Sequence, residues 1–193
     1  MAHHRVALIA LVAAAAALPC SVGARADAPA PPATSNTPSA AAAASLPATE
    51  AKLEWLTFDA ATERAAKEKK HVIVDIYTTW CGWCKVMERQ TYADPEVTSY
   101  LEKNFVLAKV NGESLNKMHW QGKELTERQF ARVVGVTGYP ATYFLKPDAE
   151  LLGGVAGFIK KPDFMVYARF VGTRWYEKGS IQAYVDSLQA AGQ

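Results

Sequence analysis

Short apolar runs and amphipathic stretches alternate along residues 51–193. The apolar runs are rich in β-branched and aromatic residues, which predicts strands at 72–77, 105–110 and 141–145. The first of these runs has the composition of a buried strand. A turn at Pro147-Asp148 predicts a fourth strand at about 151–155, paired with the third as a hairpin.

In the stretches between these runs, apolar residues recur at helical spacing. Thr57 or Asp59 is expected to cap a first helix within 55–70, and Asp94 followed by Pro95 opens another. Because strands and helices alternate, the chain is predicted to form a mixed α/β domain. The remaining helices are expected at about 81–90, 126–134, 162–175 and 181–188, so that the tail carries two of them.

A polar stretch at 111–124 interrupts this alternation. We expect it to be a solvated loop whose Trp120 covers the core, with His119 among its polar residues.

The first fifty residues differ from the rest in composition. Residues 1–26 have a short polar start, an apolar run at 6–18 and an Ala-x-Ala site at the end, which predicts a secretory signal peptide. That run is shorter than the roughly 20 residues that span a bilayer. A lipoprotein modified at Cys20 is the alternative. Residues 27–50, rich in Ala, Pro, Ser and Thr, are expected to be a disordered linker before a domain at 51–193. The predicted location is therefore periplasmic or secreted.

Charge and cysteine content narrow the range of functions that the chain can have. The formal net charge is +2, and removal of Arg5 and Arg25 with the signal peptide leaves equal numbers of basic and acidic residues. The remaining chain then has no surplus of basic residues that would favour nucleic-acid binding. Removal of Cys20 would leave Cys81 and Cys84 as the only cysteines, which is too few for a disulfide framework.

The spacing of Cys81 and Cys84 is typical of redox chemistry. Two residues separate them at a predicted helix start, so the sulfurs can form a disulfide or separate as a dithiol. Orphan N–H groups at the helix start lower the pKa of the first thiol, so Cys81 is the predicted nucleophile and Cys84 the resolving thiol. A zinc site would need His71 and His119 in addition, and we consider it the weaker interpretation. No cofactor is expected.

Three separated motifs resemble the thioredoxin superfamily. The first resembles its active-site segment and comprises Asp75, Trp80, Cys81, Gly82, Cys84 and Lys85. The second, at 108–110, is similar to the family's central strand with its buried lysine, here Lys109. The third, at 138–142, resembles the loop whose proline, here Pro140, is cis and faces the cysteines. The resemblance implies a thioredoxin-like fold, with a central mixed sheet flanked by helices. The two predicted tail helices would extend it.

Asp75 stands alone as an acid within an apolar strand. Burial raises the pKa of a carboxyl group, which makes Asp75 a candidate proton carrier. The resemblance places it under Cys84, where it would accept that thiol's proton while Lys109 tunes it. The alternative is that Asp75 and Lys109 form a structural ion pair.

Trp80, Trp83 and Tyr139 are predicted to form an apolar rim around Cys81, which favours extended peptide as substrate. The residue before Pro140 would offer backbone groups to that peptide. Packing under the loop is the alternative for Tyr139.

These observations predict an exported thiol-disulfide oxidoreductase that acts on protein substrates. Gly82 and Trp83 bring no charge between the cysteines, so the helix start alone stabilises the thiolate, which favours a reductase. By resemblance, a DsbD-like membrane carrier would supply its electrons. The alternatives are a disulfide-forming oxidase or isomerase, and a non-enzymatic binding or chaperone module.

Overall fold

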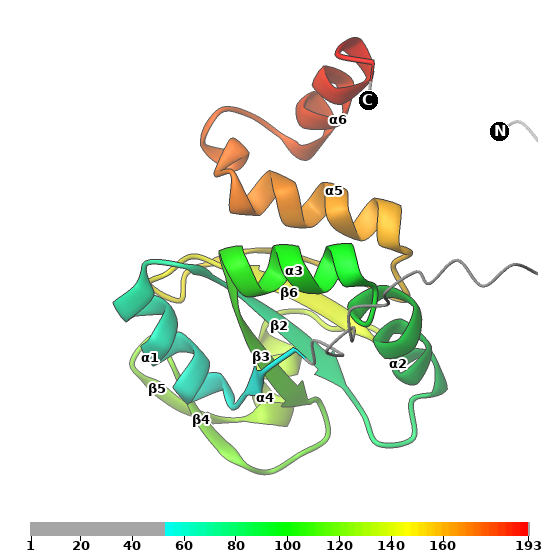
Figure 1. Ribbon diagram of the computed structural model, residues 1–193. Helices are drawn as coiled ribbons and strands as arrows, with labels where there is room; N and C mark the ends of the chain where they lie inside the picture. The colour runs from blue at the N-terminus through cyan, green and yellow to red at the C-terminus, as the bar shows by residue number, and fades with distance from the viewer. Residues whose placement is uncertain (1–52, 193) are drawn as a thin grey trace, which may run out of the picture. The chain divides into compact units, whose positions relative to one another are not determined.

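A computed structural model describes residues 53–192, and its central element is a five-stranded mixed sheet (Figure 1). The strand order is β1-β3-β2-β6-β7. The first three strands in this order run parallel, while β6 is antiparallel to β2 and β7 to β6. The strands are β1 Trp55–Leu56, β2 His71–Tyr77, β3 Phe105–Asn111, β6 Ala141–Leu145 and β7 Leu151–Ala156.

Helices connect and cover these strands, and several begin at the predicted caps. Thr57 accepts the Ala60 backbone N–H, and Asp94 accepts two N–H groups of the helix that Pro95 opens. The helices are α1 Phe58–Glu68, α2 Gly82–Met87, α3 Pro95–Asn104, α4 Glu127–Val133, α5 Lys161–Gly172 and α6 Ile181–Ala190, with a π-helical turn η1 at Glu88–Tyr92 and a 3₁₀ turn η2 at Trp175–Glu177.

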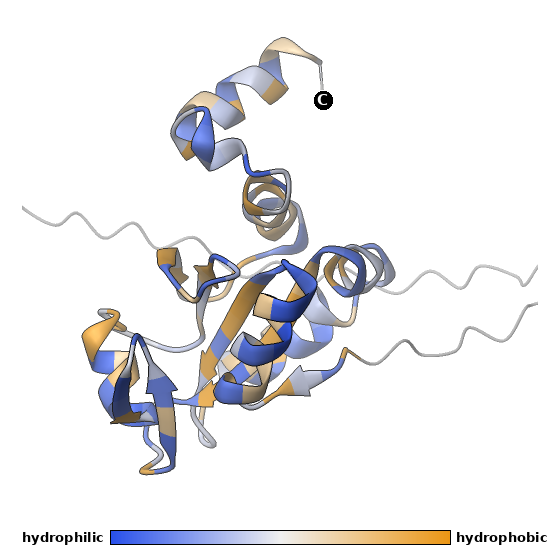
Figure 2. Cartoon of the chain, turned by 90° about the vertical axis from the view of Figure 1, so that its left-hand side faces the viewer, coloured by the Kyte–Doolittle hydropathy of each residue, from blue (hydrophilic) through white to orange (hydrophobic). Residues whose placement is uncertain are grey.

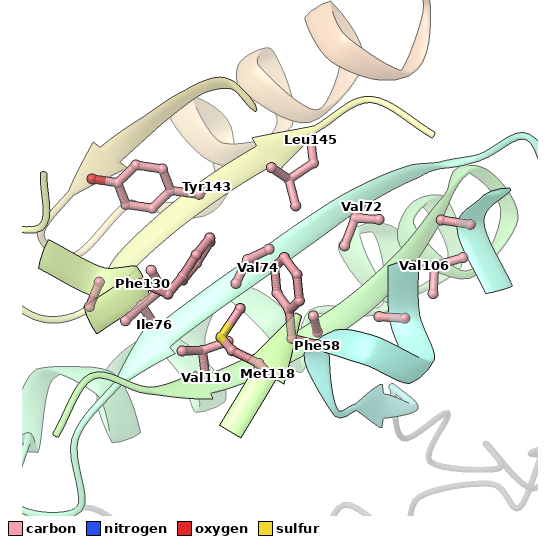
Figure 3. Close-up of a cluster of buried hydrophobic side chains, with 14 of the residues drawn as sticks. Phe58, Val72, Val74, Ile76, Val106, Val110, Met118, Phe130, Tyr143 and Leu145 are labelled. Carbon is pink, nitrogen blue, oxygen red and sulfur yellow. The ribbon is translucent and has the colours of Figure 1, made fainter. Parts of the chain in front are cut away.

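Strand β2 is buried on both faces because the sheet is covered on both sides. Hydrophobic residues are concentrated along the central strands (Figure 2). On one face, Val72, Val74 and Ile76 pack with Phe58 of α1 and Phe130 of α4 (Figure 3). Ile73 belongs to the opposite cluster, which contains residues of α3 and α5. Since successive side chains of a strand alternate between faces, Asp75 is directed to the same face as Ile73.

The start of the domain differs from the prediction. Trp55 and Leu56, expected to lie in the first helix, form an edge strand that pairs with Leu107 and Ala108 of β3. The Trp55 ring packs edge-on against Tyr92. The helix begins only after Thr57, whose extended backbone and side-chain hydrogen bond cap it.

The stretch at 111–124 is not the predicted loop throughout. It contains β4 Lys117–Trp120, which pairs antiparallel with β5 Lys123–Thr126 in a separate hairpin. Gln121 and Gly122 both have positive φ, as a tight two-residue hairpin turn requires. Two hydrogen bonds from His119 to Asp59 attach the hairpin to α1.

The expected role of Trp120 is confirmed. Its ring packs at a right angle to that of Phe130, with the centroids 5.2 Å apart. Its indole N–H donates to the Ala149 carbonyl at 2.9 Å. The indole thus covers the core while its polar group keeps a partner.

The predicted two-helix tail is present. In α5, Phe164 and Val171 are buried in the core. In α6 only Tyr184 is buried. Trp175 lies in η2 and not within the preceding helix.

The predicted signal peptide, linker and Cys20 lie outside the described residues. Within residues 53–192, no helix combines the length and the hydropathy that crossing a bilayer would demand.

Candidate active site

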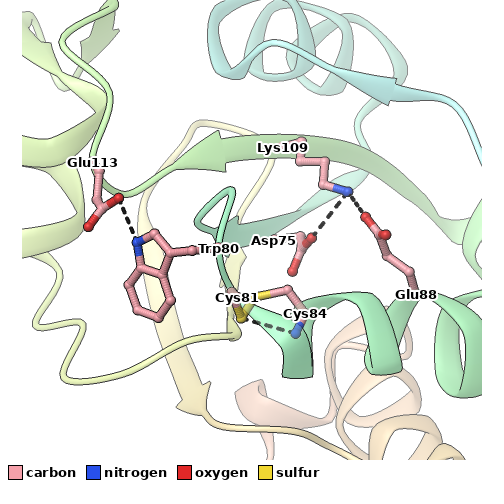
Figure 4. Close-up of a disulfide and its surroundings, with 7 residues drawn as sticks. All are labelled: Asp75, Trp80, Cys81, Cys84, Glu88, Lys109 and Glu113. Atoms are coloured by element: carbon pink, nitrogen blue, oxygen red, sulfur yellow. Dashed lines mark hydrogen bonds and ion pairs between the residues drawn. A yellow bond between two sulfur atoms is a disulfide. The ribbon is translucent and has the colours of Figure 1, made fainter.

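A disulfide joins Cys81 and Cys84 at the start of α2 (Figure 4). Cys81 is the N-cap of this helix, and its Sγ accepts the backbone N–H of Cys84 at 3.0 Å. After reduction the same position would hold a thiolate at the positive end of the helix.

Solvent exposure does not distinguish the two cysteines. In the disulfide form, Cys81 is 3% exposed and Cys84 is 6% exposed. The N-cap position is therefore the structural feature that separates them. It favours negative charge on the Cys81 sulfur, because that sulfur accepts a helix N–H group.

Asp75 is buried beside the disulfide and points toward Lys109 (Figure 4). Burial raises the pKa of its carboxyl group to about 7, although Lys109 opposes the increase. The charge of Glu88 adds to the increase. Near neutral pH, Asp75 therefore exists in comparable amounts as acid and carboxylate, so it is able to accept or release a proton.

Lys109 is shared between two carboxylates. Its Nζ lies 3.8 Å from Asp75 Oδ2 and forms a closer ion pair with Glu88. It also lies over the rings of Trp55 and Tyr77, 5.5 and 5.0 Å from their centroids. The predicted Asp75–Lys109 ion pair is therefore present, but Glu88 is the nearer partner of the lysine.

Glu88 is a site residue that the sequence analysis missed. It follows Cys84 by four residues, at the junction of α2 with η1. Residues four apart on a helix lie on the same face, so the spacing places Glu88 on the face of Cys84 but does not indicate its pairing with Lys109.

An exposed aromatic rim flanks the disulfide, as predicted. Trp80 is 67% exposed and Trp83 is 60% exposed. The Trp83 ring packs against Phe158, which the sequence analysis did not assign to the site. The Trp80 ring meets Tyr139 edge-on, and its indole N–H donates to Glu113 at 2.9 Å.

The loop at 138–142 contains the cis proline that the resemblance implied. The Tyr139-Pro140 peptide bond is cis. The Tyr139 ring occupies the space where residue 112 would carry a Cβ, so Gly112 allows this close approach. Tyr139 therefore both packs under the loop and contributes to the rim, and the two interpretations of this residue are compatible.

The two histidines considered as zinc ligands have other partners. His71 Nε2 lies 2.9 Å from the Tyr176 hydroxyl, and His119 Nδ1 lies 2.9 Å from Asp59 Oδ2. Over residues 53–192, no three histidine, cysteine or acidic side chains are grouped so as to hold a metal ion.

Comparison with protein families gives one match that spans most of the chain. Residues 40–175 match the family model Thioredox_DsbH, which is described as "Protein of unknown function, DUF255".

Curated relatives include a redox protein. Over 147 residues, the chain is 28% identical to the thiol:disulfide interchange protein DsbD of Haemophilus influenzae strain PittGG. This match covers 74% of the chain and 22% of DsbD, so the chain spans about a fifth of the length of that relative.

Two solved structures are similar in fold. A thioredoxin from Thermus thermophilus is 27% identical, with a TM-score of 0.51 over 62% of this chain and 86% of that one. A thioredoxin-fold protein from Helicobacter pylori has a TM-score of 0.57 at 13% identity, over 64% and 87% of the respective chains. The second likeness concerns the fold alone. Together they agree with the thioredoxin-like fold predicted from the sequence.

Proposed function

The chain belongs to the thioredoxin-like Thioredox_DsbH family, and from this premise we propose that it is a thiol-disulfide oxidoreductase that reduces protein disulfides. The observation that carries the proposal is the Cys81–Cys84 disulfide at the N-terminus of α2, beside a buried acid that titrates near neutral pH.

The first step uses the reduced form, in which both cysteines are thiols. The Cys81 thiolate attacks one sulfur of the substrate disulfide, and the other substrate sulfur leaves as a thiolate. A mixed disulfide then joins Cys81 to the substrate.

The second step releases the substrate. Asp75, as the carboxylate, accepts the proton of Cys84, whose sulfur attacks Cys81 Sγ and displaces the remaining substrate sulfur. Two electrons pass to the substrate, and the protein returns to its disulfide form. Lys109 and Glu88 set the charge around Asp75 and act as positioning residues.

The two uncharged residues between the cysteines support the reduction of substrate disulfides over their formation. Gly82 and Trp83 separate the cysteines, and Trp83 packs on the neutral ring of Phe158. Neither residue adds positive charge that would stabilise the Cys81 thiolate and make the disulfide a stronger oxidant. An oxidase or isomerase is the alternative, and its potential would be higher.

The exposed rim supports protein substrates. Two indoles with most of their surface in solvent present apolar area next to the disulfide, which suits an extended peptide. The predicted signal peptide favours an exported, periplasmic or secreted protein. We propose a DsbD-like membrane carrier as the electron donor there, in keeping with the similarity to DsbD.

Insulin reduction tests the proposal. The wild-type chain is expected to accelerate the precipitation of insulin by dithiothreitol, whereas the Cys81→Ser/Cys84→Ser variant is not. The Cys20→Ser variant is the matched control, since it removes the third cysteine of the chain, and it should retain the activity. Equal rates for the wild type and the double variant would favour a binding or chaperone module.

A further inference from the structure

A cavity of about 500 Å³ lies next to the aromatic rim, between α4 and the Tyr139-Pro140 loop. Arg128 and Arg132 line it from α4, and Gly112 and Glu113 line it from the segment that follows β3. Tyr139 also lines it. We propose that this cavity binds an acidic side chain of the protein substrate, a few residues away from the cysteine that exchanges with Cys81. The inference rests on the proposed function and adds the substrate class.

The charge of the cavity favours an anion. Arg128 and Arg132 are both exposed and lie four residues apart, on one face of α4. Among residues 53–192, the arginines that form ion pairs are Arg64 and Arg169, so neither cavity arginine is neutralised there. Like charges at this spacing destabilise a helix, and a carboxylate bound between them would relieve that repulsion.

Glu113 does not cancel this charge. It is a single carboxylate facing two guanidinium groups, and one of its oxygens accepts the Trp80 indole N–H. Burial raises the pKa of the Tyr139 hydroxyl, the charge of Glu113 adds to the increase, and Arg132 opposes it, so both signs of charge act at this wall of the cavity. With two guanidinium groups and a single carboxylate in its lining, the cavity keeps a net positive formal charge.

The cavity adjoins the redox centre through Trp80. This residue precedes Cys81, and its ring contacts two cavity residues, with Tyr139 at 6.1 Å between centroids and Glu113 at 2.9 Å from the indole nitrogen. In Figure 4, Trp80 and Glu113 lie on the side of the disulfide opposite to Lys109. An extended peptide advances about 3.3 Å per residue, so a chain crossing the Trp80 ring reaches the cavity within about two to four residues.

A series of peptide disulfides tests the proposal. Each substrate is the symmetric disulfide of a short peptide with one cysteine, and a single Glu is moved through the positions two to four residues on either side of it. The peptide with Gln in place of that Glu is the reference. The measurement is the second-order rate constant for oxidation of the reduced full chain, followed by tryptophan fluorescence.

We expect Glu at one or more positions to raise the rate about two- to fivefold over Gln, as one favourable exposed charge pair would. The ratio should fall as salt rises, because the Debye length is only about 10 Å at 0.1 M. Arg128→Gln/Arg132→Gln should bring the ratio close to one, and Arg132→Glu should shift the preference toward a Lys peptide. Arg89→Gln is the matched control, since it removes an exposed positive charge from η1 outside the cavity, and it should keep the wild-type ratio.

The outcomes separate this inference from the proposed function. Equal rates for the Glu and Gln peptides at every position would overturn the cavity assignment and leave the reductase intact. A Glu preference that survives in the double arginine variant would overturn it as well. If glutathione disulfide shows the same dependence on the two arginines, the cavity binds small carboxylates and not a peptide side chain. Failure of the wild type to reduce any peptide would instead contradict the proposed function.

Discussion

Replacement of Asp75 by Asn is expected to stabilise the protein at neutral and alkaline pH. Asp75 is 2% exposed, and its only nearby cation, Lys109, has Glu88 as a closer partner within the described residues. The Asn side chain is nearly the same size but carries no charge. Its introduction therefore removes a buried carboxylate without leaving Lys109 unpaired.

The size and sign of the effect follow from the pKa of Asp75, which burial raises from 3.8 to about 7. Below the lower value both the folded and unfolded states are protonated, so the carboxyl group contributes no pH dependence. Between the two values folding takes up a proton, and stability falls as pH rises by about 1.4 kcal/mol per pH unit. Above about 7 the loss is complete and amounts to roughly 4 kcal/mol at most.

Urea unfolding of the disulfide form at a series of pH values from about 4 to 9 measures this directly. The difference between Asp75→Asn and the wild type should be small near pH 4. It should grow through the interval and level off at roughly 3 to 4 kcal/mol in favour of Asn, because the amide does not titrate and its desolvation cost is the same at every pH. Groups remote from Asp75 titrate alike in both proteins, so their contributions cancel in the difference.

A difference that stays constant with pH, or an Asn variant that is less stable above pH 7, would refute this reasoning. It would mean that the carboxylate is well solvated or well paired in the folded state. Asp163→Asn is the matched control, because it removes the same charge from an exposed position of α5. Because Asp163 lies in the first turn of α5, its loss should change the unfolding free energy by no more than about 1 kcal/mol at any pH, and in favour of Asp.

Three other predictions concern the exchange reaction and the hairpin. Cys84→Ser should accumulate a mixed disulfide on Cys81, whereas Cys81→Ser should trap little substrate, and non-reducing gels that show equal trapping would contradict the assigned roles. Asp75→Asn should slow release of the second substrate thiol about 100-fold or more while sparing the first attack, since a general base acts only in the second step. Single-turnover kinetics with an unchanged release rate would reduce Asp75 to a structural residue. The hydrogen bond to Asp59 raises the pKa of His119, so the pair contributes stability below the ordinary value of 6.5 and loses it as pH rises through the higher folded value. His119→Gln should therefore lower the melting temperature more at pH 5.5 than at pH 9, and an equal loss at both would show that the charge of His119 is not involved.

Local rules were sufficient to predict most of the elements. The cap at Asp94 and the proline after it fix the start of α3 whatever surrounds them, and Thr126 caps α4 within the predicted range. Strand β1 is different, because a strand of two residues exists only through its pairing with β3. No local pattern distinguishes Trp55 in such a strand from Trp55 in a helix.

The hairpin at 117–126 could have been found. Met118 and Trp120 alternate with polar neighbours, and Gly122 marks a turn, which together are signs of paired strands. The polarity of the whole stretch concealed them. Such a short hairpin depends on anchors elsewhere in the fold, namely Asp59 and Phe130.

The candidate site was predictable where chain order and strand register determine it. Asp75 and Lys109 lie directly opposite each other on β2 and β3, and Thr142, two residues after Pro140, lies opposite Asp75 on β6. The ion pair of Glu88 and the hydrogen bond of Glu113 were not predictable, since they depend on side chains that meet only after the helices have docked.

The reduction potential of the Cys81–Cys84 pair tests the central claim most directly. The protein is equilibrated with glutathione buffers of known ratio, and alkylation of the free thiols gives the fraction reduced. A reductase requires a potential below about −180 mV, and we expect a value closer to the roughly −270 mV of thioredoxin, because no charged residue separates the cysteines. A potential above about −180 mV would contradict the account and favour an isomerase or oxidase.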